Sequence, residues 1–124
     1  QNETLNVVNV VELTLDIFNE DYIVFESDEK SIISKMDRAQ LIRIITNLVK
    51  NAIQSIPENQ VEKSVLVSVK KQDNNVLILV KDNGIGIDKE QISKIFDKHL
   101  NSVMNDPLIR KQYEKSLNLL TTHY

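Results

Sequence analysis

The strongest predicted helix of this chain contains the stretch Asn47-Leu48-Val49-Lys50-Asn51-Ala52-Ile53. Asn47 and Asn51 are four residues apart, so their amides project from the same helix face, with about 6 Å between their β-carbons. Asparagine costs a helix interior roughly 0.7 kcal/mol relative to alanine, which indicates that something offsets the cost. The pair is either two solvated amides on the wet side of the helix or a polar site. In such a site an amide oxygen would bind Mg²⁺, which prefers hard oxygen ligands, while its neighbours meet phosphate.

A second polar stretch, Asp82-Asn83-Gly84-Ile85-Gly86-Ile87, follows a predicted buried strand. Asn-Gly is a strong hairpin signal, but we predict a helix rather than a returning strand after Gly86. Gly84 and Gly86 are the only glycines of the chain, so both stand where backbone bends tightly or lets a ligand approach closely. A carboxylate at the end of a strand can accept a hydrogen bond from an exocyclic amine, the group that distinguishes adenine from guanine.

Two capping boxes and one further apolar pattern predict the helices. Asp37 and Gln40 open a helix that ends at Ile56, because Pro57 restricts the residue before it. Asp88 and Gln91 open a short helix with an apolar stripe formed by Ile92, Ile95 and Phe96. The first helix is predicted to end near Asn19, from apolar residues at helical spacing, namely Val7, Val8, Val11, Leu15 and Phe18.

The strands are predicted from β-branched and alternating residues. We expect strands over Tyr22–Phe25 and Ser31–Met36, with a polar turn at residues 26–30 between them. Alternation over residues 65–70 predicts a strand with one wet face, and the apolar run Val76–Val80 predicts a strand covered on both faces. The residues between them, Asp73-Asn74-Asn75, make this pair an antiparallel hairpin. The expected fold is therefore α+β, a two-layer sandwich.

Composition bounds the remaining possibilities. The 124 residues suit one globular domain, and a net charge of -3 gives no basic field for nucleic acid or a membrane. The chain has no cysteine, which excludes a thiolate zinc site and is consistent with a reducing compartment. No apolar run approaches the ~20 residues of a membrane span. Because the chain begins with Gln1, we expect it to be a piece of a longer protein.

Together the two polar stretches resemble a known family. Residues 47–53 are similar to the N box of the ATP-binding domain of sensor histidine kinases, and residues 82–87 to its first glycine box. Ile95-Phe96-Asp97 is similar to the start of the F box. The resemblance covers residues 5–97 and implies the Bergerat fold of the GHKL superfamily. In that fold, helices lie on one face of a mixed, largely antiparallel sheet, and ATP binds between the helices and a mobile lid.

The resemblance implies a role for each matching residue. Asn51 is implied to bind Mg²⁺, with Asn47 and Lys50 near the triphosphate. Asp82 is implied to bind the adenine amine, directly and through water, beside the loop shaped by the two glycines. The nucleotide-site residues that we expect are Asn47, Lys50, Asn51, Asp82, Gly84, Gly86, Ile87 and Phe96.

Asn47 also bears on the reaction. In the gyrase, mismatch-repair and anti-sigma-kinase relatives, a glutamate stands four residues before the magnesium asparagine and acts as a general base. An amide cannot accept that proton, so we expect poor hydrolysis and transfer of phosphate to a neutral, nucleophilic histidine instead. The resemblance thus implies a transferase of two-component signal transduction, with ATP and Mg²⁺ as cofactors.

The end of the chain departs from the family pattern. No glycine follows Phe96, so residues 98–124 contain no second glycine box of the kind that cradles phosphate. Asp106 and Pro107 begin a predicted helix with an apolar face formed by Ile109, Tyr113, Leu117 and Leu120. We therefore divide the chain into an ATP-binding domain, residues 1–97, and an atypical tail, residues 98–124. The tail either docks on the sandwich or belongs to an altered gene product.

The histidine that receives the phosphate is expected outside this chain. Neither His99 nor His123 precedes an acidic residue, as the family's acceptor does, and both are expected to be surface residues. Expected partners are ATP, the dimerisation domain that carries the acceptor, and a response regulator, but not nucleic acid or a membrane. The expected location is cytoplasmic, whether or not the parent protein is membrane-anchored. The alternatives are a nucleotide-free interaction module using the tail and, disfavoured by Asn47, a hydrolytic ATPase.

Overall fold

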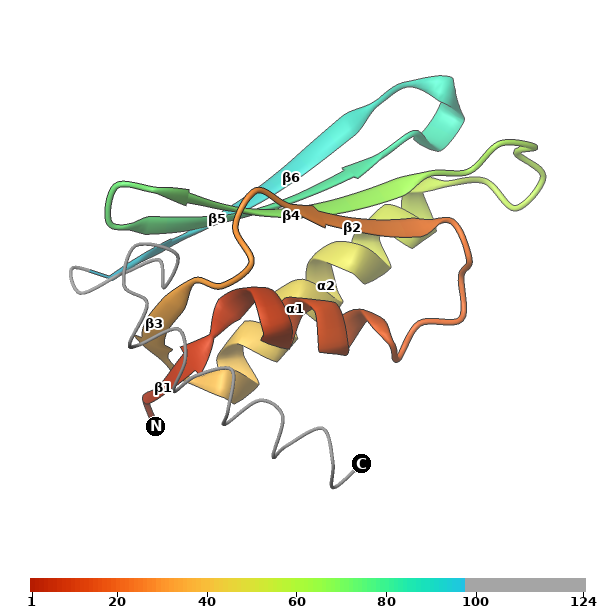
Figure 1. The fold of residues 1–124 in the computed structure, drawn as a ribbon. Helices are drawn as coiled ribbons and strands as arrows, with labels where there is room; N and C mark the ends of the chain where they lie inside the picture. Colours follow the sequence, from red (N-terminus) through yellow and green to blue (C-terminus); the bar gives the residue numbers. More distant parts are fainter. Residues whose placement is uncertain (98–124) are drawn as a thin grey trace.

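The computed structural model describes residues 1–97, which form two layers (Figure 1). One layer is a sheet in the order β2-β4-β5-β6, in which β2 is parallel to β4 and the other pairs are antiparallel. Helices α1 and α2 pack against one face of this sheet. The predicted α+β sandwich is confirmed. Its main elements are α1 (Val7–Leu15), β2 (Ile23–Ser27), α2 (Arg38–Ser55), β4 (Val65–Gln72), β5 (Asn75–Asp82) and β6 (Lys89–Phe96).

The core lies between the two helices and the sheet, and α2 and the central hairpin form its centre. The predicted hairpin is confirmed, since β4 and β5 pair antiparallel from Val65↔Asp82 to Gln72↔Asn75. The prediction that β5 is covered on both faces is wrong, because its burial alternates and Leu77 and Leu79 are only partly buried. The helices cover one face of the sheet. Fully buried side chains that line this layer are Leu41, Ile45, Val49, Val65, Val67, Val69, Val76, Ile78 and Val80.

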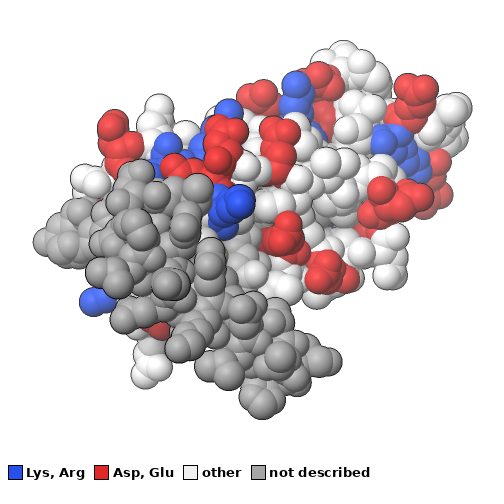
Figure 2. Space-filling view, in the orientation of Figure 1, with Lys and Arg blue, Asp and Glu red and all other residues white. Residues whose placement is uncertain are grey.

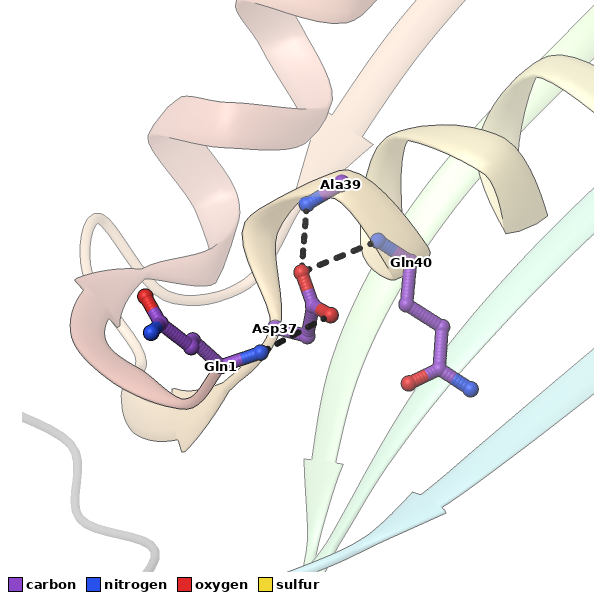
Figure 3. Close-up of polar contacts among 4 residues, drawn as sticks. All are labelled: Gln1, Asp37, Ala39 and Gln40. Atoms are coloured by element: carbon purple, nitrogen blue, oxygen red, sulfur yellow. Dashed lines mark hydrogen bonds and ion pairs between the residues drawn. The ribbon is translucent and has the colours of Figure 1, made fainter.

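The first turn of α2 is fixed by the predicted N-cap. One carboxylate oxygen of Asp37 accepts hydrogen bonds from the backbone N–H of Ala39 at 3.0 Å and of Gln40 at 3.5 Å (Figure 3). The other oxygen lies 3.3 Å from the amino terminus of Gln1. This amino group is the main cause that lowers the pKa of Asp37, and the two backbone donors act in the same direction. The carboxylate therefore satisfies donors that the helix itself leaves unpaired.

A small second sheet closes one end of the sandwich. It pairs β1 (Glu3–Asn6), which we did not predict, with β3 (Ile33–Met36). Buried Asn6 accepts from the backbone N–H of Ile32 at 3.2 Å and donates to Ser31 at 3.1 Å. The buried carboxylate of Asp97 accepts from the Ser34 hydroxyl at 2.7 Å and from the Lys35 backbone N–H at 2.9 Å. Asp97 thereby joins the end of β6 to the small sheet.

Residues 89–96 correct the main prediction for the region after the glycines. The short helix predicted from Asp88 and Gln91 is wrong, because these residues form β6, which pairs with β5 along its whole length. The hairpin interpretation that we set aside is therefore the right one for this loop. Asp88 does not open a helix and instead forms an ion pair with Lys81 at 3.2 Å. Apolar residues three and four apart fit a helical stripe, but a short run of this kind does not distinguish a helix from a strand.

Other element ends shift by a few residues. Helix α1 ends at Leu15 rather than near Asn19, although Leu15 and Phe18 both pack against the core. Strands β2 and β3 lie close to their predicted ranges but do not pair with each other. The predictions for the tail, its helix and the two histidines concern residues 98–124 and lie outside the described residues.

Candidate functional site

The C-terminal half of α2 carries the predicted polar face. Asn47, Lys50 and Asn51 are all exposed, whereas Val49 and Ala52 between and beside them are buried. The spacing of a helix places the three polar side chains on one side, with Asn47 one turn before Asn51. The segment thus presents two amides and one cation at the surface while its opposite side anchors it in the core.

The end of β5 carries the predicted carboxylate. Asp82 points to the helix side of the sheet, with Val76, Ile78 and Val80, and is only 2% exposed. Its Oδ1 atom accepts a hydrogen bond from the backbone N–H of Gly84 at 2.9 Å. This bond fixes one oxygen of the carboxylate and leaves the other available as an acceptor.

The two glycines of the loop serve different physical purposes. A β-carbon on Gly84 would lie 2.3 Å from the carbonyl oxygen of Ser55, so only glycine allows this approach to the end of α2. Gly86 has open space around it but adopts a φ of 72°, which disfavours other residues. Ile85 also has a positive φ, 60°, an outlier for a β-branched residue that the sequence did not reveal. Ile87, the last residue of the predicted glycine box, is exposed.

The two halves of the site meet at the C-terminal end of α2. Gly84 contacts the backbone of Ser55, and the Ser55 hydroxyl donates to the carbonyl oxygen of Asn51 at 2.9 Å. The loop that follows Asp82 therefore lies within one helical turn of Asn51, and the two polar stretches of the sequence adjoin each other in space.

Gln91 is a residue of this region that sequence reasoning missed. It lies on the helix side of β6, opposite Val80 in the register. Its Nε2 donates to the backbone carbonyl of Leu48 at 3.2 Å, and its Oε1 accepts from the side-chain Nδ2 of Asn51 at 3.4 Å. The sequence pattern places Gln91 in a capping box, so no local signal indicates a contact with α2; only the strand register reveals it.

Phe96 is not brought to the other predicted site residues. It lies at the end of β6, where it pairs with Asn75, whereas Asp82 is at the other end of the eight-residue strand β5. Strands rise about 3.4 Å per residue, so this separation spans most of the sheet. Phe96 is 69% exposed.

A hollow lies beside the glycine loop. It has a volume of about 590 Å³, and its lining includes Gly86 but neither Asn51 nor Asp82. The lining residues come from the loop after α2 and from the glycine loop, and they are Pro57, Asn59, Gln60, Glu62, Asn83, Ile85 and Gly86.

The surface charge of the described part is mixed. Figure 2 shows Lys and Arg side chains interspersed with Asp and Glu on the face that is drawn, without a continuous area of one sign. None of the helices in residues 1–97 has the length and apolar character of a membrane span.

Comparison with known proteins connects this geometry to one family. The sequence profile described as "Histidine kinase-, DNA gyrase B-, and HSP90-like ATPase" matches residues 36–117, more than half of the chain. The match begins just before α2, includes both polar stretches and continues past Asp97, across the boundary that we expected between domain and tail.

Similar proteins include sensor kinases. The chain is 26% identical over 101 residues to the sensor histidine kinase WalK of Bacillus subtilis, covering 77% of this chain and 16% of WalK. It is 35% identical over 83 residues to the sensor histidine kinase YvrG of the same organism, covering 66% of this chain and 14% of YvrG. The chain thus spans only a small part of the length of these relatives.

Solved structures share the fold. The nucleotide-free catalytic domain of histidine kinase ThkA matches with a TM-score of 0.60 at 21% identity, covering 68% of this chain and 60% of that one. ThkA in complex with the response regulator protein TrrA matches with a TM-score of 0.57, over 65% of this chain and 25% of that one. With its two polar stretches adjoining at the end of α2, this chain belongs to the family of histidine kinase-, DNA gyrase B- and HSP90-like ATPases, as an ATP-binding domain of the sensor histidine kinase kind.

Proposed function

We propose that this chain binds ATP with Mg²⁺ and serves as the catalytic domain that transfers the γ-phosphate to a histidine on a dimerisation domain outside the chain. The observation that carries the proposal is the contact of the Asp82-Asn83-Gly84 turn with the last turn of α2. That contact holds a buried carboxylate and the exposed amide of Asn51 at one end of the sandwich.

Asp82 is suited to select the base. Its Oδ1 is occupied by the Gly84 backbone N–H, so Oδ2 is the oxygen left to accept from an exocyclic amine. A buried carboxylate has a strong requirement for donors, because burying a charge without partners is costly. A base with an amine at this place donates a hydrogen bond to the carboxylate. A base with a carbonyl there cannot donate, and its oxygen is repelled by the carboxylate.

The amide of Asn51 fits the chemistry of a magnesium ligand. The Leu48 carbonyl can only accept, so Gln91 turns its Nε2 toward it and its Oε1 toward Asn51. Asn51 then donates through Nδ2, and its Oδ1 is the hard oxygen atom that remains for Mg²⁺. A bound Mg²⁺ would neutralise part of the triphosphate charge, and the exposed cation of Lys50 and the amide of Asn47 lie on the same helix face to meet phosphate oxygens.

Transfer to a histidine is favoured over hydrolysis by Asn47. This position offers an amide one turn before Asn51, and an amide cannot take a proton from water. The acceptor domain and a response regulator are the expected protein partners in the parent molecule. The solved complex of ThkA with TrrA supports a response regulator as the partner class.

Isothermal titration with a non-hydrolysable ATP analogue tests this function. We expect binding that weakens at least ~10-fold in Asp82→Asn, as expected for the loss of a hydrogen bond to a charged group. Asp73→Asn is the matched control, since it makes the same change in the exposed turn at the far end of β5. Binding should also weaken when Mg²⁺ is removed. Heat that is absent in the wild type, or unchanged in Asp82→Asn, contradicts the proposal and leaves the nucleotide-free interaction module.

A further inference from the structure

Gln60, in the loop between α2 and β4, makes the densest set of side-chain hydrogen bonds near the site. Its Oε1 accepts from the backbone N–H of Ile85 at 2.9 Å. Its Nε2 faces three acceptors: the backbone carbonyl of Asn83 at 2.8 Å, the Asn83 side-chain oxygen at 3.2 Å and the backbone carbonyl of Glu62 at 2.8 Å. One carboxamide therefore ties both flanks of Gly84 to the loop that follows α2.

The Asn83 side chain extends the same network. Its Oδ1 also accepts from the backbone N–H of Ser64 at 2.8 Å, and its Nδ2 donates to the Glu62 carbonyl at 3.1 Å. The glycine loop is thus held to residues 60–64 by amide groups that act as donor and acceptor at once. A carboxylate of the same shape cannot replace Gln60, because it has no hydrogen to donate and would face three oxygen atoms.

The network ends at the carboxylate proposed to select the base. Gly84, between the two residues that Gln60 holds, donates its backbone N–H to Asp82 Oδ1 at 2.9 Å. The orientation of the buried Asp82 carboxylate therefore depends on where the backbone at Gly84 stands. On the other side, Gly84 is in contact with Ser55 and has no room to shift toward α2.

We infer that Gln60 is a positioning residue that sets the preference for adenine: it holds the Gly84 backbone in the place where its N–H fixes one oxygen of Asp82 and aims the other at the base amine. The inference rests on the proposed function and concerns how the same site selects its base. Gln60 itself need not touch the nucleotide.

The test measures how much the base amine contributes to binding. We would determine dissociation constants for ATP and for purine riboside 5′-triphosphate, which lacks the amine, with Mg²⁺ present, in the wild type, Gln60→Glu and Asn59→Asp. Asn59→Asp is the matched control, because it adds the same charge one residue away on the lining of the same hollow. In the wild type and Asn59→Asp, ATP should bind at least ~10-fold tighter than the analogue, as expected for a hydrogen bond to a charged group.

In Gln60→Glu we expect this ratio to fall toward 1, while affinity for the analogue stays close to that of Asn59→Asp. A purely structural role would weaken both nucleotides alike and preserve the ratio, and that result overturns the inference. A wild type that binds ATP no better than the analogue also overturns it but leaves ATP binding standing. A wild type that binds neither nucleotide refutes the proposed function itself.

Two further measurements cover a Gln60→Glu protein that does not fold. Gln60→Asn keeps the amide, adds no charge and is one methylene shorter, so the same fall of the ratio is expected. Labelling with ¹⁵N-glycine yields only two backbone signals, from Gly84 and Gly86, because the chain has no other glycine. Exchange of the Gly84 amide hydrogen with solvent should be at least ~10-fold faster in Gln60→Asn than in Asn59→Asp, as expected for loosening of a buried hydrogen bond. Unchanged exchange contradicts the inference.

Discussion

Replacing Gly84 by alanine should destabilise the protein because of a contact with the backbone. The added β-carbon would lie 2.3 Å from the Ser55 carbonyl oxygen and 2.9 Å from its carbon, while ordinary contact begins at 3.4 Å. The loop must therefore retreat by about 1 Å from the end of α2, since neither atom belongs to a side chain that could rotate away. Overpacking of this kind costs about 1–3 kcal/mol, and the stiffer unfolded chain offsets about 0.4–1 kcal/mol. We expect a net loss of roughly 1–2 kcal/mol.

Gly86 is the control position for this prediction, because its backbone conformation, and not a steric contact, disfavours a side chain there. At a φ of 72° with no atom nearby, alanine should cost about 1 kcal/mol, and asparagine less, since asparagine tolerates the left-handed region. At Gly84 the order should reverse, because asparagine is larger than alanine. Urea unfolding at 25 °C of the four variants measures both orders. If Gly84→Ala is as stable as the wild type, steric contact with Ser55 is not the reason for this glycine.

Variants at three further positions test other features of the described structure. Ile85→Asn should stabilise the protein by about 1 kcal/mol in urea unfolding, because Ile85 is 67% exposed and strained at a φ of 60°; a loss of stability would contradict this. Asp97→Ala should cost about 2–3 kcal/mol in the same assay, since it leaves one buried and one part-buried donor unpaired, and Asp97→Asn should cost less; a neutral Asp97→Ala would refute the role of Asp97 in joining the sheets. The pKa of Asp37 is lowered in the folded state, so its contribution is present above about pH 4 and is lost as the pH falls through the folded pKa. The melting temperature of Asp37→Asn should therefore fall less than that of the wild type on acidification from pH 6 to pH 2. An equal fall would contradict a stabilising role of the ionised Asp37 carboxylate.

The parts of the fold that the sequence predicts are those with local causes. The N-cap at Asp37, the stop at Pro57 and the Asp73-Asn74 turn each act within a few residues, and the structure has α2 and the β4–β5 hairpin where they predict them. Strand β1 was missed because four residues with no clear alternation become a strand only through pairing with β3, some thirty residues away in the sequence. The unbroken apolar run Val76–Val80 predicts a β5 covered on both faces, but apolar residues such as Leu77 and Leu79 are tolerated on a half-exposed face.

The residues of the candidate site also differ in whether a local sequence signal marks them. Asn51, Asp82 and the two glycines could be found in the sequence because their residue types are unusual for where they stand in a helix, at a strand end or in a loop. Gln60 and Gln91 carry no such signal, since glutamine is ordinary in a loop or on a surface. Their roles depend on hydrogen bonds to residues 23 to 43 positions away, which no local pattern encodes.

For residues 89–96, the unpaired edge that β5 would otherwise have decides between a helix and a strand. Without β6, the buried strand β5 would present an unpaired edge, with the backbone groups of Val76 to Asp82 lacking partners on that side. Pairing along all eight residues satisfies this edge, places Ile95 against the core and brings Gln91 to α2. The cost is visible on the other face, where Ile92 and Phe96 remain 59% and 69% exposed. A helix would have gathered these two side chains with Ile95 on one stripe but left the β5 edge open, so backbone pairing outweighs the burial of two apolar side chains at this position.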